Sequence, residues 1–597
     1  MTRPAFDPRN ESSVKPPGLI AKRCFHEGQT CKRGFVALFC ATLLALGLIT
    51  RLPFRARYLY SSDEVQFALG AHDFNIAQFR PHPPGYTLFV GMLRVSIPVI
   101  RDDNLRLVAW GTAASGLSAA LLFLLSLRLF QDRRIAVLSS ILWLTNPILW
   151  FSSEVGSIYS MGALASITTA YFALRFWQKP TERAAILAGG SFAAAVGLRQ
   201  DQILLLLPVW LLPAVRYSKC RRFFPLSIIV FALGYVTWYL PTVVHAGGYR
   251  AYSSLVRQQF WGAAKGTSVF WGGPPVSHAW MLVRLGSSLA VGLLPVLLVA
   301  SIFIWKKDTS AAWRALMSDE RLHFLLIWAL PSIIFFGLVH FAKTGYILTC
   351  LAPMAVLVSS VVLGRAPFHR AASARFTALV LSVGVANTLF FLLCPRLQQP
   401  SVRAPVRWTS GVRPLLPRIL NQTVFDSGYG MIRASDQINA AYIGEISQAL
   451  KHGNGAIILI STNSPGLCSL SWRSLMYSFP QTPVLSIAGL GGPSSGNPTD
   501  ILFQLGFEKK ENWQSLRYSR TPQGEVRAFS LAGRKSGVLI FPHTLSNGIT
   551  ISIEGSATSE VAPTGSAPQA CQALSFDGLK WMNIRENATG RLLLLSP

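Results

Sequence analysis

The sequence predicts a mainly α-helical protein that crosses a membrane many times and carries a mixed α/β domain after its last span. Of its 597 residues, 51% are hydrophobic and only 14% are charged, a composition that is unusual for a soluble domain. Long apolar runs recur through the first two thirds of the chain and are typical of transmembrane helices. After residue 394 these runs stop, and shorter strand-like runs follow.

The membrane region is expected to cover residues 34–394, after a basic cytoplasmic segment, 1–33. The first apolar run follows a long leader and has no small-residue cleavage site after it, so we expect an uncleaved signal anchor. About eleven transmembrane helices are predicted, over residues 34–50, 105–130, 135–151, 155–177, 184–198, 202–215, 224–245, 281–305, 322–340, 345–363 and 372–394.

The stretch 85–99 is short for a span, contains Arg94 and lies between prolines. We therefore expect a juxtamembrane helix in the first outer loop. With this choice, the Lys and Arg residues of the later loops join the basic N-terminus on one side, which the positive-inside rule makes cytoplasmic. The net charge of +29 then needs no nucleic acid as partner, because the basic residues are scattered between apolar runs.

Residues 395–597 are expected to form an extracytoplasmic α/β domain, since an odd number of spans places them outside. A helix is predicted near 435–451, and strands are predicted at the apolar runs that begin at Ala456, Val484, Gly537 and Ile549. Cys468 and Cys571 both fall in this region. In an oxidising compartment they could form a disulfide, or they could remain unpaired.

The first outer loop, about residues 51–84, is rich in ionisable residues. Asp63 and Glu64 are adjacent carboxylates, and one interpretation is that Ser61 or Ser62 caps a helix whose N-terminus favours the acids. A functional interpretation is favoured by the further polar residues of the loop, which are His72, Asp73, Arg80 and His82. The basic residues Arg51, Arg55, Arg57 and Arg80 depart from the positive-inside pattern and are expected to need an anionic partner on this side.

Three later stretches carry polar residues at the outer ends of predicted helices. They contain Glu154 with Tyr159, Arg199 with Asp201, and Lys343 with Tyr346. Each has a structural alternative, since Glu154 could cap a helix, Arg199 and Asp201 could pair, and Lys343 could extend to the interface. All three stretches fall on the same side as the first outer loop, which favours one shared site.

Asp63-Glu64 and the turn His82-Pro83-Pro84-Gly85-Tyr86 resemble the first extracytoplasmic loop of the GT-C glycosyltransferases. This superfamily includes protein O-mannosyltransferases and lipid A aminoarabinose transferases. The stretches around Glu154 and Lys343 are similar to the same branch. The resemblance covers about residues 34–394 and implies a GT-C-like helical bundle.

The resemblance further implies an inverting glycosyltransferase that moves a sugar from a polyprenyl-phosphate carrier to a hydroxyl of a protein, lipid or glycan acceptor. Asp63 is implied as the base that accepts the acceptor's proton, with Glu64 as second choice. Arg80, Arg199 and Lys343 could neutralise the departing phosphate. The substrate-binding residues are expected to be Arg80, His82, Tyr86, Glu154, Tyr159, Arg199, Asp201, Lys343 and Tyr346. The expected partners are the sugar donor, membrane lipids and the acceptor.

No cofactor is firmly predicted. Asp63, Glu64 and Glu154 could hold a divalent cation such as Mg²⁺ or Mn²⁺, but the basic residues could neutralise the phosphate without one, and no metal ligand is assigned. The functional alternatives are a membrane glycan polymerase or ligase, a transporter or lipid flippase, and a non-catalytic scaffold. A transporter predicts ionisable residues near the midplane of the bilayer and internal repeats. The sequence slightly favours a bacterial inner membrane over an endoplasmic reticulum.

Overall fold

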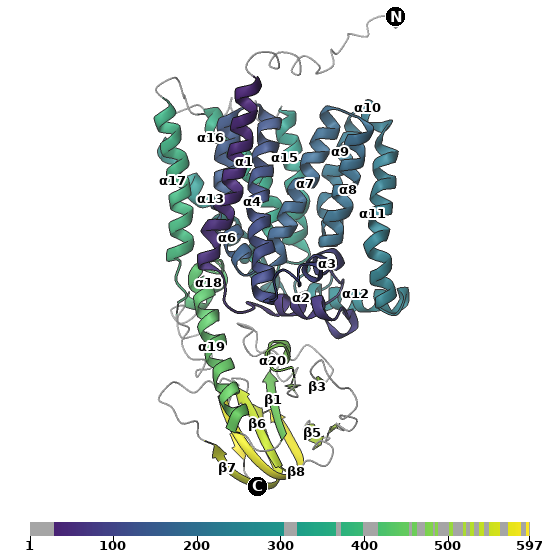
Figure 1. Ribbon diagram of the computed structural model, residues 1–597, viewed down its shortest axis with the longest axis vertical. Helices are drawn as coiled ribbons and strands as arrows, with labels where there is room; N and C mark the ends of the chain where they lie inside the picture. The colour runs from purple at the N-terminus through teal and green to yellow at the C-terminus, as the bar shows by residue number, and fades with distance from the viewer. Residues whose placement is uncertain are drawn as a thin grey trace, which may run out of the picture.

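The computed structural model describes residues 29–303, 319–365, 372–397, 416–452, 456–462 and 472–480, together with the further strands given below. The part of the chain up to residue 397 is a bundle of helices (Figure 1). Its helices are α1 (Gln29–Arg51), α2 (Ser62–His72), α3 (Thr87–Val95), α4 (Asp103–Phe130), α5 (Arg133–Leu144), α6 (Pro147–Glu154), α7 (Ile158–Gln178), α8 (Glu182–Leu198), α9 (Gln202–Arg216), α10 (Ser218–Arg221), α11 (Phe224–His245), α12 (Tyr249–Ala264), α13 (Pro275–Phe303), α15 (Glu320–Leu338), α16 (Leu348–Arg365) and α17 (Ala372–Leu393), with the 3-10 turns η2 (Leu52–Phe54), η3 (Ile76–Gln78) and η4 (Thr344–Ile347).

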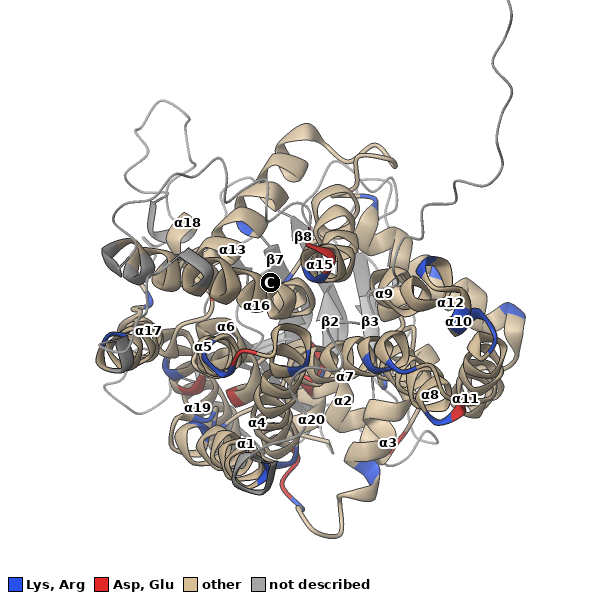
Figure 2. Ribbon diagram, turned by 90° about the horizontal axis from the view of Figure 1, so that it is seen from above, with Lys and Arg blue, Asp and Glu red and all other residues tan. Residues whose placement is uncertain are grey.

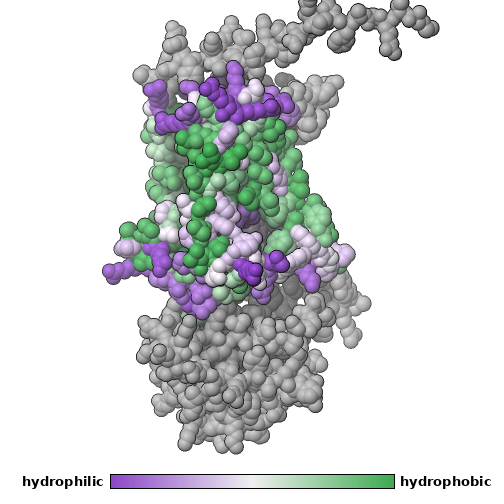
Figure 3. Space-filling view, turned by 90° about the vertical axis from the view of Figure 1, so that its right-hand side faces the viewer, coloured by the Kyte–Doolittle hydropathy of each residue, from purple (hydrophilic) through white to green (hydrophobic). Residues whose placement is uncertain are grey.

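The predicted mainly helical, multi-span architecture is confirmed. Every predicted apolar run coincides with a helix or with a bent pair of helices. Among the described residues, six helices are long and apolar enough to cross a membrane, or seven if the bent pair is one span. Figure 3 shows the apolar belt of these helices between two polar edges. Loops at the α10 end of the bundle carry many Lys and Arg residues (Figure 2).

The predicted span 135–151 is not one continuous helix. The axes of α5 and α6 differ by 48°. Asn146 caps α6 by accepting a hydrogen bond from the backbone N–H of Ile148, and Pro147 occupies the first turn. A proline inside one continuous helix would lack an N–H donor and would clash with the preceding turn, so the chain begins a new helix here. The amide of Asn146 also donates to the Gly292 carbonyl at 3.0 Å, which ties the break to α13.

Glycines set the close approach of α1 and α4. A Cβ atom on Gly47 would lie 2.7 Å from the Gly116 Cα, and one on Gly116 would lie 3.0 Å from the Leu44 Cα. Small residues allow two backbones to approach closely in a membrane, where van der Waals packing stabilises helix pairs. The outer loop after α1 is therefore attached to a tightly packed pair of helices.

We expect Gly47→Ala to destabilise the protein by about 1–3 kcal/mol, because the added methyl group meets backbone atoms that cannot move independently. The measurement is the midpoint of thermal unfolding in detergent. Gly91→Ala is the matched control, since Gly91 is also helical and no heavy atom lies within 4 Å of its added Cβ. Equal midpoints for the two variants would contradict this account of the α1–α4 contact.

The elements at the opposite end from α10 are short. The helix α3 has nine residues, too few to cross a bilayer, as predicted for 85–99. The helix α12, which was not predicted, lies at the same end of the bundle (Figure 1). Tyr252 of α12 donates a hydrogen bond to the Pro84 carbonyl at 3.1 Å. This contact fixes α12 to the turn that contains His82.

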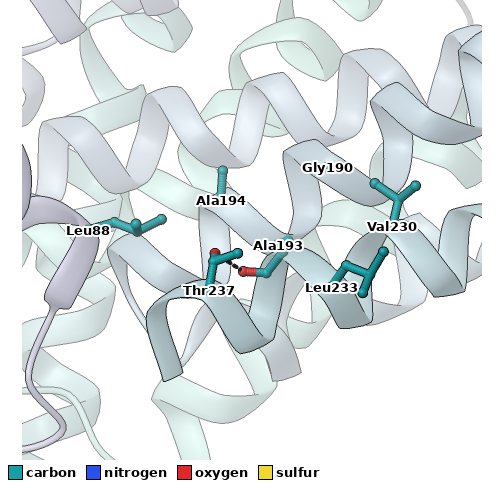
Figure 4. Close-up of a pocket in the computed structure, with 8 residues that line it drawn as sticks. Leu88, Gly190, Ala193, Ala194, Val230, Leu233 and Thr237 are labelled. Atoms are coloured by element: carbon teal, nitrogen blue, oxygen red, sulfur yellow. Dashed lines mark hydrogen bonds between the residues drawn. The ribbon is translucent and has the colours of Figure 1, made fainter. Parts of the chain in front are cut away.

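An apolar hollow of about 380 Å³ lies between α8 and α11, beside α3 (Figure 4). It exists because several of its lining residues are small; the lining consists of Leu88, Gly190, Ala193, Ala194, Val230, Leu233, Gly234 and Thr237. The Thr237 hydroxyl donates to the Gly234 carbonyl at 2.7 Å. None of the predicted site residues lines the hollow, so it is separate from the candidate active site.

The last part of the chain contains helices and one mixed sheet. The elements are α18 (Leu416–Gln422), α19 (Tyr429–His452), β1 (Ala456–Thr462), α20 (Trp472–Ser478), β2 (Val484–Ile487), β3 (Ile501–Gln504), β4 (Tyr518–Arg520), β5 (Val526–Phe529), β6 (Ser536–Pro542), β7 (Ile549–Val561), β8 (Cys571–Glu586) and β9 (Leu593–Leu595). The sheet order is β3-β2-β1-β6-β8-β5-β4, and β7 pairs with β8 and β9. The strand β1 is parallel to β2 and β6, whereas β8 is antiparallel to its neighbours. The proposed Cys468–Cys571 pairing involves Cys468, which lies outside the described residues.

Candidate active site

The helix α2 begins at the carboxylate pair of the first outer loop. Ser61 is its N-cap, and the Ser61 hydroxyl accepts a hydrogen bond from the backbone N–H of Asp63, as predicted. The same hydroxyl donates to the Glu64 carboxylate. Glu64 is buried, whereas the Asp63 side chain keeps about a quarter of its surface exposed. Of the two acids, Asp63 is therefore the one that another molecule could reach.

Lys343 lies beside Asp63, although 280 residues separate them in the chain. The Lys343 Nζ atom is 2.6 Å from Asp63 Oδ2 and 2.9 Å from Ser61 Oγ. The lysine precedes η4, which packs close to α7 because Gly345 has no side chain: a Cβ there would lie 2.6 Å from the Tyr159 Cγ atom. The close packing of η4 thus places a cation against the carboxylate.

The two carboxylates have opposite pKa shifts. Burial alone would raise the pKa of Asp63, but the positive charges of Lys343 and Arg473, that of His82 once it is protonated in acid, and the hydrogen bond from Lys343 outweigh burial and lower this pKa to about 2. Burial raises the pKa of Glu64, and the neighbouring charge of Asp63 adds to the effect. Asp63 is therefore ionised at neutral pH, as a proton acceptor must be, and it is the more exposed of the two acids.

His82 and Tyr86 form the next part of the site. The His82 Nε2 atom lies 3.2 Å from the Tyr86 hydroxyl. Burial lowers the pKa of His82, and the charges of Lys343 and Arg473 act in the same direction against that of Asp63. The imidazole is thus neutral at pH 7 and can donate or accept one hydrogen bond at each nitrogen.

Arg199 lies between two aromatic rings. Its guanidinium carbon is 4.9 Å from the centre of the Tyr159 ring and 5.0 Å from that of Tyr346. Arg199 is also ion-paired with Asp201. Burial opposes its charge, but Asp201 and the neighbouring tyrosines outweigh burial and raise the pKa of Arg199. The predicted alternative of an Arg199–Asp201 pair is confirmed, and the pair holds the two rings in place.

The residues around Asp63 and those around Arg199 belong to one electrostatic cluster. Burial raises the pKa of Tyr86, and the hydroxyls of Tyr86 and Tyr346 both interact with the charges of Asp63 and Arg199. The structure thus brings together nine of the predicted residues, from four separate stretches of the chain. They are Asp63, Glu64, His82, Tyr86, Tyr159, Arg199, Asp201, Lys343 and Tyr346.

Glu154 and Arg80 have other partners. Glu154 is fully buried at the end of α6, where it accepts from the Trp150 indole N–H, and the guanidinium of Arg51 lies 4.9 Å from the same ring. Arg80 is ion-paired with Asp73 at 2.8 Å. Arg51 and Arg80 were expected to need anionic partners on this side, and the protein itself supplies them as Glu154 and Asp73.

One acidic and one basic neighbour of the site were not predicted. Asp426, which precedes α19, accepts a hydrogen bond from the Thr344 hydroxyl and lies 3.5 Å from an Arg284 nitrogen. Burial raises the pKa of Asp426 against the charges of Arg284 and Lys343. Arg473 of α20 is the second. Both follow the membrane region by long stretches, so neither has a sequence signal that links it to the first outer loop.

Within the described part of the chain, no group of three His, Cys, Asp or Glu side chains could hold a metal ion. Asp63, Glu64 and Glu154, the three acids considered for a cation, therefore do not form such a group. The site thus consists of one exposed carboxylate, one lysine in contact with it, a neutral imidazole and tyrosine hydroxyls. Such a set can accept a proton and can bind an anionic group.

The fold is similar to that of a solved membrane protein. A crystal structure of ArnT from Cupriavidus metallidurans bound to undecaprenyl phosphate matches with a TM-score of 0.53 and 13% identity, over 91% of this chain and 98% of that chain. The structure of the same protein in the apo state matches with the same TM-score. At this identity the likeness shows that the chain has an ArnT-like fold.

Sequence comparison agrees with the fold. The chain is 26% identical over 403 residues to the undecaprenyl phosphate-alpha-4-amino-4-deoxy-L-arabinose arabinosyl transferase of Pectobacterium carotovorum, a match that covers 62% of this chain and 68% of that protein. A relative of the same name from Proteus mirabilis is 24% identical over 400 residues, with the same coverage. No protein-family model matches the chain. In sequence and in fold the chain is thus similar to membrane enzymes that transfer a sugar from undecaprenyl phosphate, the class that the sequence predicted.

Proposed function

We propose that this protein transfers a sugar from a polyprenyl-phosphate carrier to a hydroxyl acceptor on the non-cytoplasmic face of the membrane, with inversion at the anomeric carbon. The observation that carries the proposal is the contact between Asp63 and Lys343 at the end of the bundle where α2, α3 and α12 gather. It joins a proton acceptor and a phosphate-binding cation, the two groups that this reaction requires.

Asp63 is the proposed base. A hydroxyl is a weak nucleophile, so a positioned carboxylate must take its proton as the bond to the anomeric carbon forms. Asp63 is ionised and partly exposed, whereas Glu64 is buried against Ser61. We assign Glu64 a positioning role: it holds the Ser61 hydroxyl, which in turn accepts from Lys343.

Lys343 is the proposed partner of the donor phosphate. Its ammonium group lies against Asp63 in this structure, and a bound phosphate would compete for it. When Lys343 turns toward the phosphate, Asp63 loses its strongest cationic neighbour and its pKa rises toward that of a useful base. The same lysine then stabilises the charge that develops on the leaving group.

The remaining residues shape the site in this proposal. His82 and Tyr86 offer hydrogen bonds to the donor, while Arg199 and Asp201 fix the rings of Tyr159 and Tyr346. Arg80 and Glu154 act through the loop and helix that they anchor rather than by contact with substrate. Charge neutralisation is assigned to Lys343 rather than to a divalent cation, and transfer is expected to persist in excess EDTA.

The relatives support a polyprenyl carrier and a pentose donor. Their names state an undecaprenyl phosphate-linked aminoarabinose, and the related ArnT crystal structure contains undecaprenyl phosphate. An acceptor that carries a hydroxyl on lipid or glycan completes the reaction. The aligned region spans about two thirds of the relatives' length, so donor and acceptor are both assigned here by similarity.

The proposed topology has eleven spans in a bacterial inner membrane, with residues 1–33 in the cytoplasm, the catalytic region at 34–394 and an α/β domain at 395–597 outside. Its support is the basic character of the loops at the α10 end (Figure 2). Alkaline phosphatase fused after Pro597 should be active and one fused after Arg134 inactive. The reverse pattern would contradict the topology.

The test of function uses the full chain in liposomes with radiolabelled undecaprenyl-phosphate pentoses and hexoses and a lipid A-containing acceptor. We expect release of undecaprenyl phosphate together with a labelled acceptor. A wild-type protein that consumes no donor but moves a fluorescent polyprenyl lipid across the bilayer would instead be a flippase. Labelled chains of growing length would identify a polymerase.

A further inference from the structure

The helix α20 connects the C-terminal sheet to the first outer loop. It packs against β1 and β2 on one side and against α2 on the other (Figure 1). In the chain it follows α2 by about 400 residues. No other element of the sheet region has such a contact with α2 among the described residues, so α20 is the place where that region meets the candidate active site.

Two side chains of α20 contact the first outer loop, and a third contacts the first residue of α4. The Tyr477 hydroxyl donates to Asp103 Oδ2 at 2.9 Å, and the buried Met476 sulfur lies 3.5 Å from an Arg80 nitrogen. The Arg473 guanidinium lies over the Phe79 ring, 5.0 Å from its centre. These contacts lie along one helix face, because residues three and four apart are neighbours on a helix.

The backbone of the loop is shaped for this contact. Phe79 has a φ of +58°, in the left-handed region that side chains other than glycine seldom adopt. It ends the turn η3, and the next residue, Arg80, is held by Asp73 and Met476. Stacking on Phe79 restricts the guanidinium of Arg473 to the side of the loop on which α2 begins.

The charge of Arg473 acts on the same groups as that of Lys343. It lowers the pKa values of Asp63 and of His82. Two cations from separate parts of the chain, Lys343 and Arg473, therefore act on the proposed base. Both lie outside the membrane-spanning helices, where the headgroup phosphate of a lipid carrier would lie.

The proposed reaction gives a second cation a specific task. In the donor the phosphate is a diester with one negative charge. As the bond between the anomeric carbon and the phosphate oxygen breaks, that oxygen keeps the electron pair, and the carrier leaves as a monoester dianion. The acceptor oxygen forms the new bond to the anomeric carbon, and its proton goes to Asp63. One lysine neutralises the single charge of the diester. A second cation is needed to stabilise the additional negative charge that develops on the leaving phosphate.

We propose that Arg473 binds the phosphate of the carrier together with Lys343, so that α20 supplies a residue of the donor site and the sheet region is part of the catalytic unit. This assignment rests on the proposed function. It also distinguishes two roles, because Lys343 contacts the base and the phosphate in turn, whereas Arg473 stabilises the product dianion most strongly.

The experiment measures binding of undecaprenyl phosphate and donor kinetics for the full chain in nanodiscs. We expect Arg473→Gln to weaken binding of undecaprenyl phosphate about tenfold to a hundredfold, as for other hydrogen bonds to charged groups. It should lower kcat for transfer more than it raises KM for the donor. Arg473→Lys should restore most of the binding, since it keeps the charge.

Arg433→Gln is the matched control, because Arg433 is exposed on α19 in the same region of the chain. It should bind undecaprenyl phosphate as the wild type does. Tyr477→Phe removes only the hydrogen bond to Asp103 and reports whether loosening α20 is sufficient for the loss. If Tyr477→Phe reproduces the loss, or if Arg473→Gln lowers the thermal midpoint with unchanged binding, Arg473 is a packing residue and the assignment is overturned.

The outcome for the wild type separates this inference from the proposed function. A wild type that neither binds undecaprenyl phosphate nor transfers sugar would contradict both the proposed function and the role of Arg473. If the wild type binds undecaprenyl phosphate and transfers sugar, and Arg473→Gln behaves in the same way, only the role of Arg473 is contradicted.

Discussion

Replacing Asp63 by asparagine is expected to reduce kcat for sugar transfer by about 10²–10⁴-fold, the range that removal of a general base produces. The amide keeps the size of the carboxylate but cannot accept the proton of the hydroxyl. Binding of the donor should persist, because Asp63→Asn also releases Lys343 from its ion pair. The measurement is the single-turnover rate with labelled donor and saturating acceptor.

Glu64→Gln is the matched control for Asp63→Asn. The amide oxygen can still accept the hydrogen bond that the Ser61 hydroxyl donates to Glu64. We expect a rate within about tenfold of the wild type. A larger loss in Glu64→Gln than in Asp63→Asn would assign the base to Glu64 instead.

The second large effect is expected for Lys343→Met. The substitution removes a cation that lowers the pKa of Asp63, and burial then raises this pKa above its value of about 2. In the wild type, kcat/KM should therefore show no acid limb from Asp63 between pH 8 and about pH 5. In Lys343→Met the limb should move upward in pH, and KM for the donor should rise as the phosphate loses its cation.

The same shift has a consequence for stability. Because the folded-state pKa of Asp63 lies below its unfolded value, the ionised group stabilises the wild type above that unfolded value, and the contribution is lost as the pH falls toward 2. Lys343→Arg is the control for charge. If the pH profiles of Lys343→Met and the wild type coincide, Lys343 does not set the ionisation of Asp63.

The sequence predicted the membrane architecture because hydrophobic length and the positions of Lys and Arg are local properties. The same positions placed Asp63, Arg199 and Lys343 on one side, and the structure brings all three into one cluster. The break between α5 and α6 was missed, although Asn146-Pro147 carries a capping signal followed by a proline. Here the long apolar run obscured a local signal that was present.

Other features of the site could not be predicted, because they depend on contacts between distant residues. Nothing near Lys343 in the sequence indicates that its ammonium group lies against Asp63 rather than in the interface. The sequence does not show which anions pair with Arg51 and Arg80. In the folded chain Glu154 lies close to Arg51, and Asp73 pairs with Arg80. Asp426 and Arg473 follow residue 394 and lie beyond the stretch 34–394 that carries the main resemblance.

The contact of α20 with α2 affects the biogenesis of the enzyme. The helices up to α17 can insert into the membrane as they emerge from the ribosome, but α20 follows only after the last of them. Closing a loop of about 400 residues is slow compared with forming neighbouring helix pairs. With the sheet region outside and Arg473 in the donor site, as proposed above, a chain whose export stalls before α20 would lie in the membrane as an incomplete catalyst, and sugar transfer would begin only once translocation is complete.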